Sequence, residues 1–122
     1  AKPQSIKNLK IPINSLEKKE DINLTWRKKV NNELKTSYQK IYDLVDKIIY
    51  LKVPNFKYVL KWRLLQEKKL RLKNKKKTMS NKQIKKFIMF YERVTKTMSK
   101  NYKNYDFIIT IDKKHKIKSV QY

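Results

Sequence analysis

Glycine is absent from all 122 residues of this chain, and no other feature constrains it as strongly. Glycine ordinarily makes up about 7% of a protein. Both common phosphate-binding loops require it, because only glycine lets the backbone turn tightly and approach a phosphate closely. The chain therefore cannot form a Gly-rich phosphate loop of its own. Its first residue is Ala1 rather than methionine, and together these features predict a fragment, or a chain whose first part lies elsewhere.

The chain has a formal net charge of +23, from 33 basic and 10 acidic residues, and lysine supplies 29 of the basic ones. A nucleic-acid-binding protein would use such a charge to neutralise phosphates. The alternative is a compositional origin, because lysine, isoleucine, asparagine and tyrosine all have AT-rich codons and are abundant together here. The scarcity of arginine, whose fork binds phosphates and bases in pairs of hydrogen bonds, favours that alternative. In either case we expect weak, salt-screened attraction to polyanions.

Several protein classes are excluded by what the sequence lacks. Without cysteine there is neither a disulfide scaffold nor a thiolate metal site. No run of 18 apolar residues is present, so we expect no membrane span. The start has no apolar core segment, so we do not expect a signal peptide. These features together predict a cytoplasmic protein.

The first part of the chain is expected to be mainly helical. Pro3 and Pro12 interrupt residues 1–19, which we expect to be irregular. Residues 20–37 are predicted to form a helix that has Glu20 and Asp21 in its first turn. The apolar residues that recur along this helix are Ile22, Trp26, Val30 and Leu34. A second helical stretch, 38–46, is expected to turn three residues inward, namely Ile41, Tyr42 and Val45.

Strands and helices alternate in the remainder. Residues 47–53 are rich in β-branched side chains and predict a strand, which Pro54 ends. Apolar and charged residues at helical spacing predict a helix over 56–73, followed by a basic loop over 73–79. A helix over 80–98 should begin with a capping box. That box would pair Ser80 with Gln83, and six apolar residues should line one face of the helix: Ile84, Phe87, Ile88, Tyr91, Val94 and Met98.

The last part of the chain predicts strands. Residues 99–105 read as a polar linker. The apolar run 106–111 is typical of a strand buried on both faces of a parallel sheet. A turn over 112–116 and a short edge strand over 117–120 complete the chain. The order of elements predicts an α/β layered fold in which helices dominate, with two or three strands. So few strands cannot close such a core, which again indicates a fragment.

Several short segments resemble, in their order and spacing, the C-terminal half of the P-loop small-molecule kinases of the plant-type D-glycerate kinase group. Relatives of this group are phosphoribulokinase, uridine kinase and bacterial pantothenate kinase. The resemblance covers roughly residues 11–120. The segments that carry it are 12–17, Trp26-Arg27, Val30-Asn31, Leu34, Tyr38-Gln39, 51–56, 62–67, Leu70-Arg71, Met79-Ser80, 91–95 and the strand ending at Asp112.

This resemblance implies a partial P-loop kinase-like three-layer fold, with 1–122 as the C-terminal part of one kinase domain. The phosphate-binding loop and the acidic strand on the Mg²⁺ side would lie in a missing N-terminal half. The parent enzyme would transfer the γ-phosphate of ATP to the hydroxyl of a small-molecule substrate, with Mg²⁺ bound. We expect this chain alone to bind neither ATP nor Mg²⁺ and to be inactive.

Two arginines of the helix over 56–73 are candidate lid residues that contact nucleotide phosphates. Arg63 and Arg71 are two helical turns apart and project from similar faces, and the resemblance places both in the lid. The alternative is a solvated basic face, with Glu67 paired to both arginines at i,i+4 spacing. The sequence leaves both interpretations open.

The resemblance also makes Asn31 and Tyr38 candidates for the substrate side; as isolated residues they fit a helix-face amide and a core tyrosine. Trp26 and Trp62 could stack on a ring, although buried tryptophans more often belong to a core. His115 has no carboxylate or cysteine near it and is assigned no role. We expect no metal site, no carboxylate pair for acid/base catalysis and no hydrolase triad, and the catalytic residues stay unassigned.

Residues 56–86 contain 13 basic residues and one acid, Glu67, with three aromatic residues at the start: Phe56, Tyr58 and Trp62. Such a stretch could bind single-stranded nucleic acid, or it could be a lid that closes over ATP phosphates. We favour the lid because the neighbouring segments fit it. The alternative to a kinase fragment is therefore a non-enzymatic, Lys-rich nucleic-acid-binding protein, and a degenerate fragment without function is a third possibility.

Overall fold

The computed structural model describes residues 1–73, 78–100 and 105–122. Residues 74–77 of the expected basic loop and 101–104 of the expected linker lie outside the described residues. The chain divides into two compact units, Ala1–Lys47 and Ile48–Tyr122.

The first unit is helical from near its start, so the expectation of an irregular segment over 1–19 is wrong. Helices α1 (Ile6–Lys10) and α2 (Ser15–Glu20) occupy much of that segment. Each begins at a polar side chain that caps its first turn, Ser5 for α1 and Asn14 for α2. The prolines precede the helices instead of interrupting them, and that position is one that proline tolerates.

The helix expected over 20–37 is shorter and begins later. Helix α3 spans Thr25–Lys35, and α4 (Ser37–Tyr42) follows it directly. Asp21 lies before α3 and not in its first turn. Its carboxylate accepts hydrogen bonds from the backbone N–H groups of Trp26 (2.8 Å) and Arg27 (3.1 Å). Asp21 therefore caps the first turn of α3, although it lies outside the helix.

The buried face of α3 is polar, contrary to the apolar stripe expected from the sequence. Trp26 and Ile22 are exposed, whereas Arg27 and Asn31 are buried. A charged residue can occupy a core when it is paired with an opposite charge and hydrogen-bonded. The Arg27 guanidinium is paired with Asp21 and makes three hydrogen bonds, one from each nitrogen: Nε to Asp21 Oδ2 (2.8 Å), Nη1 to the Leu9 carbonyl (2.6 Å) and Nη2 to the Asp21 carbonyl (2.5 Å).

Helix α4 also departs from the expectation. The residues predicted to face inward, Ile41, Tyr42 and Val45, are all exposed. The helix ends at Tyr42, after only six residues, so Val45 lies beyond it. The apolar residues buried in the first unit come from α1 and α2 instead, and they are Leu9 and Leu16.

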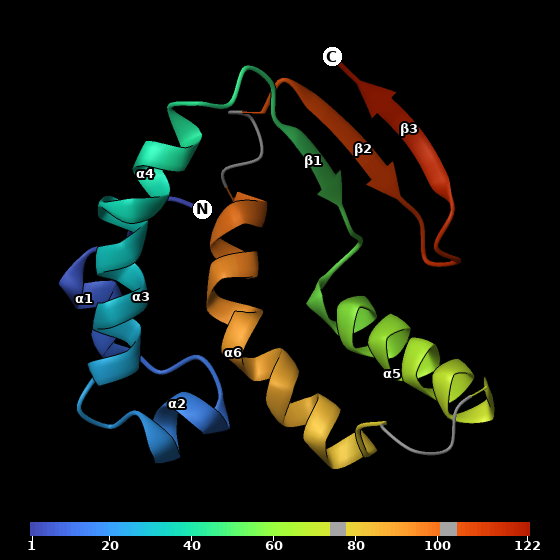
Figure 1. Ribbon diagram of the computed structural model, residues 1–122, viewed down its shortest axis with the longest axis horizontal. Helices are drawn as coiled ribbons and strands as arrows, with labels where there is room; N and C mark the ends of the chain where they lie inside the picture. The colour runs from blue at the N-terminus through green and yellow to red at the C-terminus, as the bar shows by residue number, and fades with distance from the viewer. Residues whose placement is uncertain (74–77, 101–104) are drawn as a thin grey trace. The chain divides into compact units, whose positions relative to one another are not determined.

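The second unit contains a three-stranded sheet and two long helices (Figure 1). Its elements are β1 (Ile49–Lys52), α5 (Phe56–Lys73), α6 (Asn81–Lys100), β2 (Phe107–Ile111) and β3 (Ile117–Gln121). The strand order is β1-β2-β3, with β1 and β2 parallel and β2 and β3 antiparallel. These elements confirm the expected α/β class and the short edge strand.

Helix α6 begins as its capping box predicts. The N–H of Ser80 donates to Gln83 Oε1 (2.8 Å), and the N–H of Gln83 donates to Ser80 Oγ (3.2 Å). The predicted apolar face is buried at Ile84 and Ile88, whereas Phe87 and Tyr91 on the same face are exposed.

The sheet is only partly covered. Every residue of β2 is half-buried, although its apolar sequence predicted burial on both faces, and every residue of β3 is exposed. In β1, Tyr50 is buried and stacks on the Tyr105 ring at 4.8 Å, but Ile49 and Leu51 are exposed. A parallel pair is normally covered on both faces, so the described elements provide only part of the layers that such a sheet requires.

Candidate functional site

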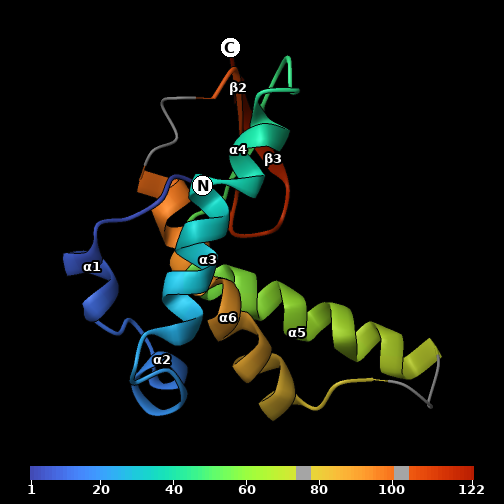
Figure 2. The same ribbon diagram turned by 60° about the vertical axis from the view of Figure 1, so that its left-hand side comes forward.

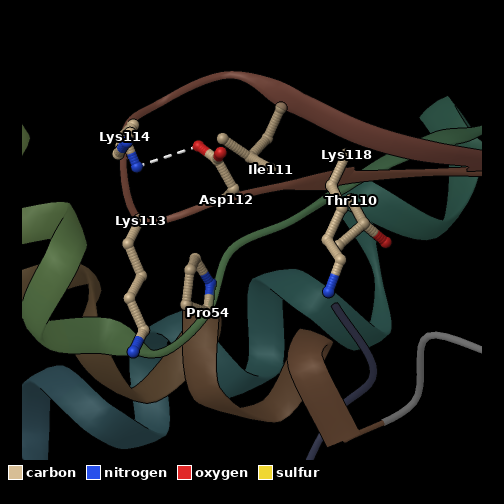
Figure 3. Close-up of a pocket in the computed structure, with 7 residues that line it drawn as sticks. All are labelled: Pro54, Thr110, Ile111, Asp112, Lys113, Lys114 and Lys118. Atoms are coloured by element: carbon tan, nitrogen blue, oxygen red, sulfur yellow. Dashed lines mark hydrogen bonds between the residues drawn. The ribbon is translucent and has the colours of Figure 1, made fainter.

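A hollow opens at the edge of the sheet where the two parallel strands end. Because β1 and β2 are parallel, their carboxyl ends meet at one edge, which is where open α/β sheets bind ligands. Its volume is about 550 Å³. Figure 3 shows the residues that line it, which are Pro54, Thr110, Ile111, Asp112, Lys113, Lys114 and Lys118. Three lysines at one hollow make it suited to an anion.

Asp112 shapes the turn that carries two of these lysines. Its carboxylate Oδ1 accepts hydrogen bonds from the backbone N–H groups of Lys114 and Lys116, each at 2.8 Å. The Lys116 bond is the largest of the causes that hold the pKa of the Asp112 carboxyl below its ordinary value, and burial opposes it. The carboxylate is therefore ionised near neutral pH and engaged with the backbone of its own turn.

The same turn presents an aromatic ring to α5. His115 has a φ of 63°, in the left-handed region, and its ring stacks on Trp62 with centroids 4.3 Å apart and an interplanar angle of 16°. Trp62 in turn contacts Tyr58 one helical turn earlier, at 5.9 Å. Figures 1 and 2 both show the β2–β3 turn beside the first half of α5. Three rings thus form a continuous group next to the hollow.

The two candidate lid arginines both lie on α5 but have different partners. Arg63 Nη1 donates to Glu67 Oε2 at 2.8 Å, which is one of the two i,i+4 pairs of the alternative, solvated-face interpretation. Arg71 instead donates from Nη2 to Asn81 Oδ1 (2.7 Å) and to the Met79 carbonyl (3.1 Å). Its Nε is buried and has no hydrogen-bond partner within the described part of the chain.

Glu67 joins these groups. It is buried, and its Oε1 accepts the backbone N–H of Met79 at 2.7 Å. That bond is the main cause that lowers the pKa of the Glu67 carboxyl; burial opposes it, and Arg63 and Arg71 lower the pKa further. A single carboxylate therefore fixes the Arg63 side chain and ties α5 to the residues that precede α6.

The substrate-side candidates lie in the first unit. Asn31 is buried, and its amide binds both backbone groups of Gln4: Oδ1 accepts the N–H at 2.7 Å, and Nδ2 donates to the carbonyl at 3.0 Å. Tyr38, in the first turn of α4, is half exposed. The two hydrogen bonds of Asn31 hold the start of the chain against α3.

Metal and membrane chemistry find no support among the residues that the structure describes. No group of three His, Cys, Asp or Glu side chains there comes together as a metal site. None of the described helices combines the length and apolar character that crossing a bilayer requires.

A solved structure of D-glycerate 3-kinase from Cryptococcus neoformans var. grubii serotype A matches the fold. The match covers 98% of this chain, with a TM-score of 0.71 and 19% sequence identity. This chain has the fold of part of a glycerate kinase. It spans only 45% of the length of the solved kinase chain, so the match is to a partial kinase domain. No family model and no curated protein matches the sequence.

Within this partial glycerate kinase fold, the predicted roles stay predictions for Arg63, Arg71, Asn31 and Tyr38. Sequence reasoning anticipated the bond from Arg63 to Glu67 only as part of the alternative, solvated-face interpretation. It missed His115, which was assigned no role, and the hollow that lies beside that histidine. The run of four lysines over 113–118, directly after an apolar strand, was the available signal.

Proposed function

We propose that this chain is the C-terminal portion of an ATP-dependent small-molecule kinase similar to glycerate kinases. The parent enzyme would transfer the γ-phosphate of ATP to a hydroxyl of its substrate. The observation that carries this proposal is the fold match, which extends over 98% of this chain but over less than half of the kinase. A contiguous part of a kinase domain would give such a match, with nearly all of the shorter chain covered and only part of the longer one.

In this proposal, Arg63 and Arg71 act at the phosphate end of ATP. A phosphoryl transfer needs fixed positive charge where negative charge develops. Glu67 holds the Arg63 guanidinium in one orientation, and the buried Nε of Arg71 is a donor that a phosphate oxygen could satisfy. Asn31 and Tyr38 are proposed for the substrate side, where Asn31 would act by holding α3 against the start of the chain.

The chain needs a partner for this chemistry, namely the N-terminal half of the kinase. Without glycine it has no Gly-rich phosphate-binding loop, and no three His, Cys, Asp or Glu side chains come together as a metal site among its described residues. In the parent, Mg²⁺ would neutralise phosphate charge while Arg63 and Arg71 orient the nucleotide. The outer edge of β1, which pairs with no strand among the described residues, offers the missing half a place to extend the sheet.

The test uses the polypeptide encoded by the whole reading frame that contains this chain. ADP release is measured with ATP, Mg²⁺ and a panel of small hydroxy acids and other alcohols, glycerate included. We expect turnover with at least one acceptor. The variant Arg71→Ala should lower kcat, whereas the matched variant Lys69→Ala on the same helix should not. Absence of turnover with every acceptor, or equal effects of the two variants, would overturn the proposal.

A further inference from the structure

The first half of α5 and the β2–β3 turn together form a surface that is both aromatic and basic. It combines the three neighbouring rings Tyr58, Trp62 and His115 with lysines on both sides of them. On α5, Lys57 and Lys61 lie 5.7 and 5.9 Å from the centre of the Tyr58 ring. At the turn, three lysines line the hollow, namely Lys113, Lys114 and Lys118. We call these residues the ring–lysine surface.

Nearby carboxylates offset only part of its charge. The described acids of α5 and the turn are Glu67 and Asp112. Glu67 is buried and bound to Arg63 and Met79, and Asp112 accepts hydrogen bonds from its own turn. Asp112 also lines the hollow and interacts electrostatically with Lys114, so this one carboxylate offsets part of the charge of the three lysines there. The surface therefore presents positive charge beside aromatic rings.

We propose that the ring–lysine surface binds single-stranded nucleic acid. His115 is exposed and has one ring face on Trp62, so a nucleobase can extend this stack from the outer side. Base–aromatic stacking requires an unpaired base, which selects a single strand over a duplex. Figure 3 shows Lys113 and Lys118 on the Pro54 side of the strands, where the hollow can receive the sugar–phosphate backbone.

The spread of the lysines favours a strand over a mononucleotide. They lie on both sides of the ring stack, on α5 and on the turn, so that several successive phosphates can be contacted. Lysine neutralises phosphates as a point charge and does not read bases. The proposal therefore predicts binding with little sequence preference and with strong dependence on salt. It stands independently of the proposed kinase function, since it uses no phosphate loop and no missing half.

The test is a binding titration of the chain with fluorescently labelled single-stranded DNA and RNA of about 12 nucleotides, within the size range that one such site covers. Two charge-reversal variants are compared. One is Lys113→Glu/Lys114→Glu/Lys118→Glu on the surface, and the other is Lys18→Glu/Lys19→Glu/Lys28→Glu on α2 and α3. Both change the net charge equally, and circular dichroism establishes that each variant folds.

We expect the surface variant to weaken binding about tenfold or more, and the control variant by much less. If the surface variant does not fold, Lys113→Ser/Lys118→Ser replaces it, with Lys18→Ser/Lys28→Ser as its control. Equal losses in surface and control variants would show that net charge alone attracts the strand, and the proposal would fail. It would also fail if ATP displaced the strand at equal phosphate concentration, or if duplex DNA or anionic vesicles bound as tightly.

The ring stack has its own readout. Binding should quench the fluorescence of Trp62 in a Trp26→Phe background, because a base joins the stack. His115→Ala should weaken binding about fivefold or more while leaving the salt slope unchanged, since stacking involves no counterion release. Unchanged affinity in this variant, or no quenching on binding, would remove the rings from the proposed site.

Discussion

Replacing the buried Arg27 tests most directly whether its ion pair with Asp21 stabilises the first unit. The Arg27 side chain is 3% exposed, and that of its partner Asp21 is 9% exposed. Arg27→Met keeps much of the volume but removes three hydrogen bonds, so the Leu9 and Asp21 carbonyls each lose a donor. Breaking one side of a buried ion pair costs about 3–5 kcal/mol. The Asp21 carboxylate keeps two backbone donors, so we expect a loss near the lower limit, about 3 kcal/mol.

The assay is urea unfolding followed by tryptophan fluorescence. In a Trp62→Phe background, Trp26 is the remaining tryptophan, and it is adjacent to Arg27 on α3. The matched control is Lys28→Met, which removes an exposed charge from the next position of the helix. We expect that control to change the free energy of unfolding by less than about 0.5 kcal/mol.

A double-mutant cycle with Asp21→Asn isolates the pair. The combined variant should lose less stability than the sum of the single variants, by about 1–2 kcal/mol, because the two residues share one interaction. A loss below about 1 kcal/mol for Arg27→Met, or strict additivity in the cycle, would refute the view that this ion pair organises the unit.

Four other predictions follow from the contacts described above. Asn31→Ala should lower the free energy of unfolding by about 1–3 kcal/mol, since it removes both bonds to Gln4, whereas exposed Asn32→Ala should be nearly neutral in the same urea assay. Glu67→Gln should lower the urea midpoint reported by Trp62 fluorescence more than Glu92→Gln does, because the Glu67 side chain is 4% exposed, whereas the side chains of the Glu92–Lys96 pair are 13% and 47% exposed; equal shifts would contradict this role. His115→Gly should be more stable than His115→Ala by about 1 kcal/mol, because both lose the ring but only glycine adopts a φ of 63° without strain; equal thermal midpoints would count against it. Burial alone would raise the pKa of the Asp21 carboxyl. The hydrogen bonds from the Arg27 side chain and from the backbone N–H groups of Trp26 and Arg27, together with the charge of Arg27, outweigh burial, so the pKa lies below its ordinary value. The unfolded chain then takes up protons first, and the stability that Asp21 contributes should be present above about pH 4 and be lost as the pH falls further. Urea titrations across this range should show a smaller acid loss for Asp21→Asn than for the unchanged chain.

The parts of the fold that depend on local signals could be predicted from the sequence. Helix α5 has the predicted bounds, and α6 begins at the predicted capping box, because spacing and capping act over a few residues. The β2–β3 turn and the edge strand were found for the same reason. The partial kinase fold rested on the order of several short segments, and the structural match confirms that resemblance.

The errors arose where distant residues decide the outcome. Periodicity assigned the apolar stripe of α3 to the core, but Arg27 is buried there because the Leu9 carbonyl, 18 residues earlier, satisfies one of its donors. Asn31 is used by Gln4, 27 residues away. His115 gained a partner only when the turn brought it to Trp62 on α5. No local pattern encodes such pairings, so the ring stack could not be predicted from the sequence.

The three-stranded sheet has two outer edges, on β1 and β3, with which no described strand pairs. Unpaired edges invite self-association, because their N–H and C=O groups can join those of another copy. The large positive charge of this chain opposes such stacking, since two copies repel each other before their edges meet. The excess of lysine thus opposes self-association through the unpaired sheet edges. Concentrated salt weakens this effect, because it shortens the range of the repulsion between copies.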